Sequence, residues 1–176
     1  MRIALFDSGI GGLTVLSHAR RVLPSEEFLF FADRDHVPYG TKSVPVVRGY
    51  VREAFRFLVE KQGADAVVVA CNTATSVAVD EMRRLYEVPI IGMEPAVKKA
   101  LAQDGERRVL VTATPITING EKLRRLVSAH DTHHLVDLLA LPRLVEFAER
   151  REFTSPCVEE YLWNALGKYD LVHYSA

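Results

Sequence analysis

Short apolar runs alternate with helical patterns along most of this chain. The runs predict strands at residues 3–6, 28–32, 66–70, 89–92, 108–112, 135–139 and 169–172. Between them, apolar residues recur every three or four positions, which is the period of a helix with one buried face. Because strands and helices alternate, we expect an α/β fold in which helices flank parallel sheets.

A polar stretch at residues 103–107 separates two sets of these strand–helix units. We therefore expect a first α/β lobe at residues 1–103, which contains Cys71, and a second at residues 104–176, with the polar stretch as a hinge. No helical pattern follows the predicted strand at 169–172, so the second lobe is expected to be incomplete and to expose apolar sheet surface.

The composition indicates an ordinary globular protein. Of the 176 residues, 48% are hydrophobic and 26% are charged, and the net charge of −1 gives no bias toward nucleic acid or an anionic membrane. The longest apolar runs are too short to span a bilayer, and no signal peptide pattern follows Met1. A cytoplasmic protein is the expectation.

The most informative stretch is residues 67–75, where an apolar run leads into Cys71 and then into small polar residues. A thiol at the carboxyl end of a buried strand lies where open α/β sheets bind ligands, and a following helix N-terminus favours its thiolate. The alternative is a small buried hydrophobic residue, but the neighbours Asn72 and Thr73 favour a functional role. The other cysteine, Cys157, lies in a predicted first helical turn, and we interpret it as packing. With only these two cysteines and no C-x-x-C spacing, neither a disulfide nor a metal site is expected.

A glycine-rich turn, Asp-Ser-Gly-Ile-Gly-Gly at residues 7–12, follows the first strand. Such a turn could cradle a phosphate, although it lacks the Lys-Ser/Thr pair of a P-loop and the spacing of dinucleotide folds. A turn without a ligand stays the alternative. In a parallel sheet, Asp7 would share one edge with Cys71.

Two further groups of polar residues lie after predicted strands. Tyr39 and Gly40 could bind a carboxylate through a hydroxyl and an N–H group, although Pro-Tyr-Gly is equally a plain turn. Thr114 and Thr117 repeat the small polar pattern in the second lobe, where helix capping is the alternative.

Taken together, five motifs resemble the glutamate racemases, within the aspartate/glutamate racemase superfamily. They occur in the same order and cover most of the chain up to about residue 150; they are Asp7-Ser8-Gly9-Ile10-Gly11-Gly12, Phe31-Ala32-Asp33 with Val37-Pro38-Tyr39-Gly40-Thr41-Lys42, Ala70-Cys71-Asn72-Thr73-Ala74-Thr75, Gly92-Met93-Glu94-Pro95-Ala96 and Ala113-Thr114-Pro115-Ile116-Thr117.

The resemblance implies a cofactor-independent isomerase that interconverts L- and D-glutamate and supplies D-glutamate for peptidoglycan. It implies two lobes with one catalytic cysteine each, a homodimer being left open. Cys71 would be the acid/base of the first lobe, assisted by Asp7. The implied substrate contacts are Asp7, Ser8, Tyr39, Gly40, Asn72, Thr73, Thr114 and Thr117.

The chain departs from the family at its last residues. The family continues into Gly-Cys-Thr-His, which carries the second cysteine, and then into a C-terminal segment that completes the first lobe; this chain reads His173-Tyr174-Ser175-Ala176. We therefore expect a fragment, a frameshift product or a natural short form in which racemisation is impaired and α-proton exchange is the most that is retained. The alternative is a non-catalytic remnant that binds a dicarboxylate or a partner.

Overall fold

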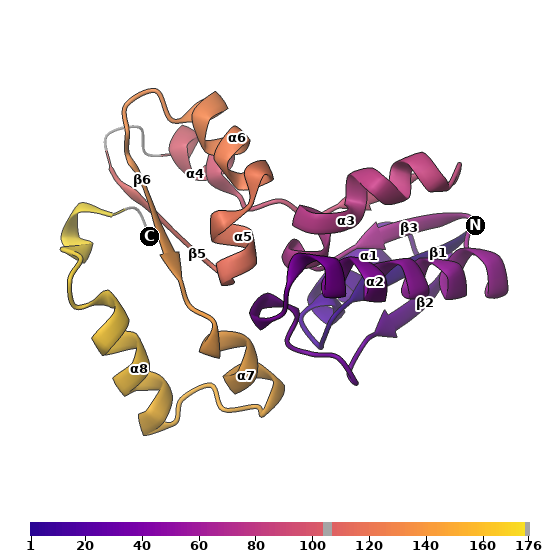
Figure 1. Cartoon of the computed structure of the whole chain (residues 1–176), viewed down its shortest axis with the longest axis horizontal. Coiled ribbons are helices and arrows are strands. Elements are labelled where there is room, and N and C mark those ends of the chain that lie inside the picture. The colour runs from indigo at the N-terminus through magenta and orange to yellow at the C-terminus, as the bar shows by residue number, and fades with distance from the viewer. Residues whose placement is uncertain (104–106, 175–176) are drawn as a thin grey trace. The chain divides into compact units, whose positions relative to one another are not determined.

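The computed structural model describes residues 1–103 and 107–174. The chain forms two compact units, Met1–Glu94 and Pro95–Ala176, each an α/β structure with a parallel sheet (Figure 1). The expected α/β class is confirmed. Helix α4 (Val97–Gln103) belongs to the second unit, whereas the predicted boundary assigned these residues to the first lobe. The central residues of the predicted hinge, 104–106, lie outside the described part of the chain.

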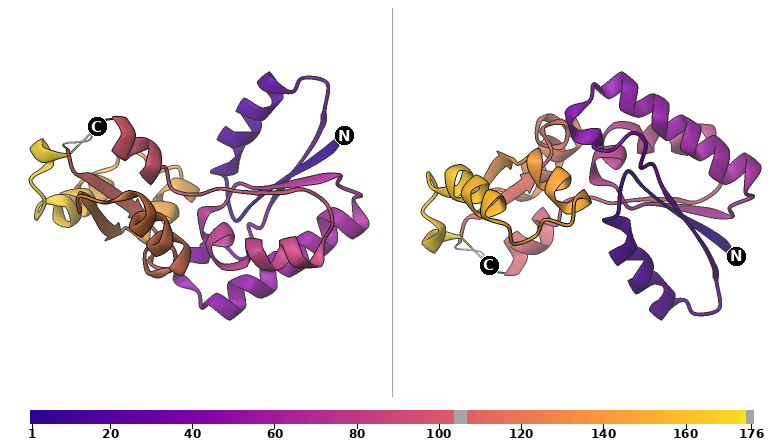
Figure 2. Two further views of the ribbon diagram at one scale, coloured as in Figure 1. Left: turned by 90° about the horizontal axis from the view of Figure 1, so that it is seen from above. Right: turned by 90° about the horizontal axis from the view of Figure 1, so that it is seen from below.

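The first unit contains a four-stranded parallel sheet in the order β2-β1-β3-β4. Its strands are β1 (Arg2–Asp7), β2 (Glu27–Ala32), β3 (Ala66–Val69) and β4 (Ile90–Gly92). Helix α1 (Gly12–Val22) covers one face, while α2 (Val44–Phe55) and α3 (Asn72–Leu85) cover the other (Figure 2). The central strand β1 is buried on both faces, since Ala4, Leu5 and Phe6 are inaccessible to solvent.

The end of α2 differs from the regular helix that the sequence predicts. After Phe55 the chain continues as a π-helical segment, η2 (Arg56–Lys61). Gly63 then adopts a φ of 63°, a left-handed conformation that glycine accepts without steric cost.

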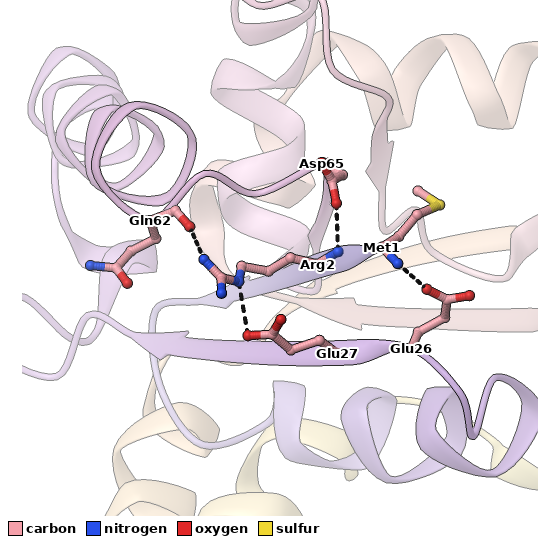
Figure 3. A network of polar contacts seen from close by, with 6 residues as sticks. All are labelled: Met1, Arg2, Glu26, Glu27, Gln62 and Asp65. Atoms are coloured by element: carbon pink, nitrogen blue, oxygen red, sulfur yellow. Dashed lines mark hydrogen bonds and ion pairs between the residues drawn. The ribbon is translucent and has the colours of Figure 1, made fainter.

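The amino ends of the strands are joined by exposed polar contacts (Figure 3). The Met1 ammonium donates to Glu26 at 2.6 Å, which raises the pKa of that amino group. Arg2 donates through its backbone N–H to Asp65 at 2.6 Å and through Nε to Glu27 at 2.8 Å. These contacts tie β1 to its neighbours at the edge of the sheet opposite Cys71.

The second unit contains a two-stranded parallel sheet of β5 (Val109–Ala113) and β6 (Val136–Ala140). Its core is formed by apolar residues of β5, α4 and α6 (Glu121–His130), namely Val97, Val109, Val111 and Leu123. Two helices follow β5, because Gly120 is extended between α5 (Pro115–Asn119) and α6. The remaining helices are α7 (Arg143–Glu149) and α8 (Pro156–Leu166).

The predicted strand at 169–172 is wrong, because the chain there forms a 3-10 turn, η3 (Leu171–His173). The side-chain carboxylate of Asp170 accepts from Val172 N at 3.4 Å, and the backbone carbonyl of Asp170 accepts from His173 N at 3.1 Å. Both bonds favour the turn. The chain is extended only at Tyr174, which forms a parallel bridge with Arg108.

None of the helices in the described ranges combines the length and the apolar composition needed to cross a membrane.

Candidate functional site

Cys71 lies at the carboxyl end of β3, directly before α3, as the sequence pattern predicts. It occupies the N-cap position of α3, and its sulfur accepts from Ala74 N at 3.4 Å. The residue is 6% exposed, so that the thiol is almost completely removed from solvent. The thiol is therefore held at a helix N-terminus and at the edge of a parallel sheet.

Asp7 and Ser8 lie beside this cysteine because β1 and β3 are adjacent in the sheet. Ser8 Oγ is 3.4 Å from Cys71 Sγ. The two carboxylate oxygens of Asp7 accept from Ser8 N at 2.8 Å and from Gly12 N at 2.7 Å. The three side chains are buried at one sheet edge, as expected from a parallel arrangement.

The glycine-rich turn is closed by this carboxylate. A Cβ atom on Gly12 would lie 2.9 Å from the Asp7 Cβ and 3.1 Å from the Ala70 Cβ, so a side chain does not fit there. The Gly12 N–H is already bonded to a negative charge, which disfavours a phosphate at the same turn. The geometry therefore favours the alternative of a turn without a phosphate.

The surroundings of Cys71 act on its acidity in opposite directions. Burial raises the pKa of the Cys71 thiol, and the negative charge of Asp7 raises it further. Hydrogen bonds from Ser8 and from the Ala74 N–H lower it, but they do not compensate. The helix end alone favours a thiolate, yet the net effect of these surroundings is a raised pKa, which favours the neutral thiol.

Tyr39 and Gly40 lie in the 3-10 turn η1 (Tyr39–Thr41), and both are buried. The Tyr39 hydroxyl donates to Asp33 Oδ2 at 2.5 Å, and its ring lies 6.4 Å from that of Phe6 between ring centroids. Burial and the bond to Asp33 raise the pKa of Tyr39, and a thiolate at Cys71 would raise it further. The Tyr39 side chain therefore lies near enough to Cys71 to interact with it electrostatically.

The remaining sequence-predicted contacts divide between the two units. Asn72 is the exposed first residue of α3, whereas Thr73 after it is buried. In the second unit, Thr114 Oγ1 and Thr117 Oγ1 lie 3.1 Å apart. Thr114 occupies the N-cap position of α5, but its hydroxyl contacts the side chain of Thr117 and makes no capping bond to the helix, so the capping alternative is not observed.

Two residues that support the site lie in the motifs quoted from the sequence but were not predicted to be site residues. Asp33 follows β2 directly, and its carboxylate holds Tyr39; the strand-end rule that identified Asp7 applies to it equally. Thr75 Oγ1 donates to Val69 O at 3.3 Å and accepts from Met93 N at 3.0 Å, which joins the ends of β3 and β4. No sequence pattern indicates that Thr75 joins the ends of β3 and β4.

Within the described residues, no group of histidine, cysteine, aspartate and glutamate side chains is arranged to hold a metal ion.

Comparison with known proteins extends the match beyond this site. The family model for Asp/Glu/Hydantoin racemase matches residues 14–168. A glutamate racemase of Campylobacter curvus is 53% identical over 182 residues, which covers 100% of this chain and 68% of that protein.

Solved structures agree with the sequence relatives. A glutamate racemase of Campylobacter jejuni is 30% identical with a TM-score of 0.83, covering 96% of this chain and 68% of its own. A glutamate racemase of Escherichia coli, in complex with L-glutamate and the activator UDP-MurNAc-ala, is 27% identical with a TM-score of 0.86, covering 96% of this chain and 65% of its own. The chain thus spans about two thirds of the length of the relatives it matches. With its strand-end cysteine and these relatives, the chain belongs to the glutamate racemases of the Asp/Glu/hydantoin racemase family.

Proposed function

We propose that this chain binds glutamate at the carboxyl edge of its first sheet and that Cys71 transfers the α-proton of the bound amino acid. One observation carries the proposal: a buried thiol at a strand end, 3.4 Å from a serine hydroxyl, occurs in a chain that is 53% identical to a glutamate racemase. The Escherichia coli relative binds L-glutamate, which supports the choice of ligand.

Proton transfer requires a base that can reach the α-carbon and return the proton as an acid. Cys71 can act as the acid that returns a proton, because burial and the charge of Asp7 raise the pKa of the thiol and favour its protonated form. To act as the base, Cys71 must become a thiolate. The ammonium group of glutamate would lie beside Asp7 and offset the negative charge that disfavours the thiolate. Asp7 would therefore assist Cys71 through the bound substrate.

Small polar residues around the thiol would hold the substrate. Ser8 and Thr73 are buried beside or just after Cys71, and Asn72 adds an amide at the first position of α3. Gly40 would contribute its backbone in η1. Hydroxyl and N–H donors are the groups that bind carboxylates and stabilise charge that develops during proton abstraction.

The 176-residue chain would perform this chemistry from one face only. Racemisation needs a second acid/base group on the opposite face of the α-carbon. The other cysteine of the chain, Cys157, is exposed on α8 and is not at the end of a strand. We therefore propose that the chain exchanges the α-proton without inverting the centre; with a second group, the activity would supply D-glutamate for peptidoglycan in the cytoplasm.

The test is proton NMR of L-glutamate in heavy water with the purified 176-residue chain, together with chiral analysis of the product. Loss of the α-proton signal without formation of D-glutamate is expected. Cys71→Ala should lower the exchange rate about 100-fold or more, since a general acid/base group contributes that much. Cys157→Ala is the matched control and should exchange at the rate of the wild type.

The alternatives give different results. Glutamate binding that survives Cys71→Ala, with no exchange by the wild type, would identify a non-catalytic dicarboxylate-binding protein. Formation of D-glutamate by the wild-type chain would contradict the proposal of one-face chemistry.

A further inference from the structure

Asp33 lies at the end of β2, next to the strand that carries Asp7. Its backbone N–H donates to Asp7 O at 3.0 Å, which continues the pairing of β1 and β2 by one residue. Its side chain is only 12% exposed. A carboxylate in this position needs hydrogen-bond donors, because burial of an unpaired charge is costly.

The two oxygens of Asp33 are divided between two donors. Oδ1 lies 2.8 Å from His36 Nδ1 and Oδ2 accepts from the Tyr39 hydroxyl at 2.5 Å. A carboxylate only accepts, so Nδ1 of His36 carries the hydrogen. The His36 ring stacks on Tyr50 with 3.9 Å between centroids and 19° between planes, which fixes the ring and so the orientation of the Asp33 carboxylate.

The bond to Asp33 uses the one hydrogen that the Tyr39 hydroxyl possesses. A phenol in this state cannot also donate to the carboxylate of a ligand, and the charge of Asp33 behind it would repel such a carboxylate. Because Tyr39 is 1% exposed, its ring cannot carry the hydroxyl oxygen to a different place without repacking.

We propose that Asp33 is a positioning residue, which accepts the hydrogen bond of the Tyr39 hydroxyl and so fixes the η1 turn beside Cys71. Tyr39 then contributes packing and a hydrogen-bond acceptor to the site, and it does not donate to the substrate carboxylate. This inference rests on the proposed binding of glutamate at this edge. Under this inference Tyr39 no longer donates a hydrogen bond to the substrate carboxylate, and it is instead a part of the turn that Asp33 holds in place.

A double-mutant cycle on glutamate affinity tests the proposal. The variants are Asp33→Asn, Asp33→Ala, Tyr39→Phe and the double variant Asp33→Ala with Tyr39→Phe. The matched control is a second tyrosine–carboxylate pair in the same unit, in which Tyr86 donates to Glu60 at 3.1 Å. Tyr86→Phe and Glu60→Gln should leave the affinity unchanged.

If Asp33 acts through Tyr39, the effects of the two substitutions overlap. Asp33→Ala and Tyr39→Phe should each raise the Kd for glutamate about fivefold, and the double variant should raise it no further. Asp33→Asn keeps an acceptor oxygen and should recover most of the lost affinity. The rate of α-proton exchange at saturating glutamate should stay within about twofold in all of them, because the thiol itself is not changed.

A second measurement does not depend on glutamate. The buried hydroxyl hydrogen of Tyr39 should give a downfield proton resonance that exchanges slowly with solvent, present in the wild type and absent in Tyr39→Phe and Asp33→Ala. Thermal unfolding of each variant shows whether it is folded at the temperature of the assays.

The outcomes separate the two proposals. Losses of affinity that add up in the double variant, or a loss above about 100-fold for Tyr39→Phe with none for Asp33→Ala, would show that Tyr39 donates to the substrate directly and would overturn this inference alone. Absence of the hydroxyl resonance from the folded wild type would also overturn it. A wild type that does not bind glutamate would overturn the proposed function and this inference together.

Discussion

Ser8 Oγ lies 3.4 Å from Cys71 Sγ, and this hydrogen bond opposes the effect of burial on the pKa of the thiol. The two residues come from adjacent strands, since Ser8 follows β1 and Cys71 follows β3. Their contact couples the acidity of the proposed proton-transfer group to the conformation of the glycine-rich turn.

Substitution Ser8→Ala should raise the pKa of the Cys71 thiol further, because the hydrogen bond from Ser8 lowers it in the wild type. The thiolate fraction at any pH below that pKa would then fall. The rate of alkylation of Cys71 by iodoacetamide, measured against pH in a Cys157→Ser background, reports this fraction. The alkylation profile should shift to higher pH.

The control for this substitution is Ser17→Ala, which removes an exposed hydroxyl from α1 in the same unit. It should leave the alkylation profile unchanged. If Ser8→Ala does not move the profile either, the serine does not act on the thiol.

Asp7→Asn should have two effects of opposite kind. Removal of the negative charge lowers the pKa of the Cys71 thiol, since Asp7 raises it, and alkylation at neutral pH should become faster. An amide has one acceptor oxygen in place of two, so one of the N–H groups of Ser8 and Gly12 loses its partner. We expect a loss of about 1–3 kcal/mol in the free energy of unfolding, measured with urea. Faster alkylation without lost stability would mean that the two N–H bonds contribute little.

The pH dependence of stability follows from the same thiol. In the folded protein burial raises the pKa of Cys71 above its ordinary value of 9.0, so the folded state holds the proton more tightly than the unfolded chain. The associated stability is complete below about pH 9 and is lost as the pH rises through the folded pKa. Urea unfolding at several pH values should show this loss in the wild type and a smaller one in Cys71→Ala. An equal loss in Cys71→Ala would assign it to other groups with raised pKa values, such as Tyr39 and Tyr86.

Much of this site could be predicted because parallel strands place their carboxyl ends at one edge. That rule brings Asp7 to Cys71 from the strand pattern alone, and the structure confirms it. It does not predict the acidity of Cys71: the sequence shows a helix N-terminus, which favours a thiolate, but not the depth of burial, which outweighs it.

Contacts that depend on loop conformation could not be predicted. Asp33 and Tyr39 are joined through the turn between β2 and α2, and no periodic pattern describes that turn. Likewise, the apolar run at residues 169–172 has the composition of a strand, but the local bonds of Asp170 favour a 3-10 turn. Local hydrogen bonds decided the structure in both segments.

Gly12 should be the most sensitive glycine near the site. An alanine Cβ there would lie 2.9 Å from the Asp7 Cβ, 3.0 Å from Phe30 Cε2 and 3.1 Å from the Ala70 Cβ, so the turn or the strands must shift. We expect Gly12→Ala to lower the free energy of unfolding by about 1–3 kcal/mol and to slow α-proton exchange, since Asp7 would move away from Cys71. Gly49→Ala is the matched control, because nothing lies within 4 Å of its Cβ in α2, and it should raise stability by up to about 1 kcal/mol. Urea unfolding and the exchange assay measure both variants. Equal stability of the two would show that the close approach of the glycine turn to β1 and β3 does not penalise a side chain at position 12.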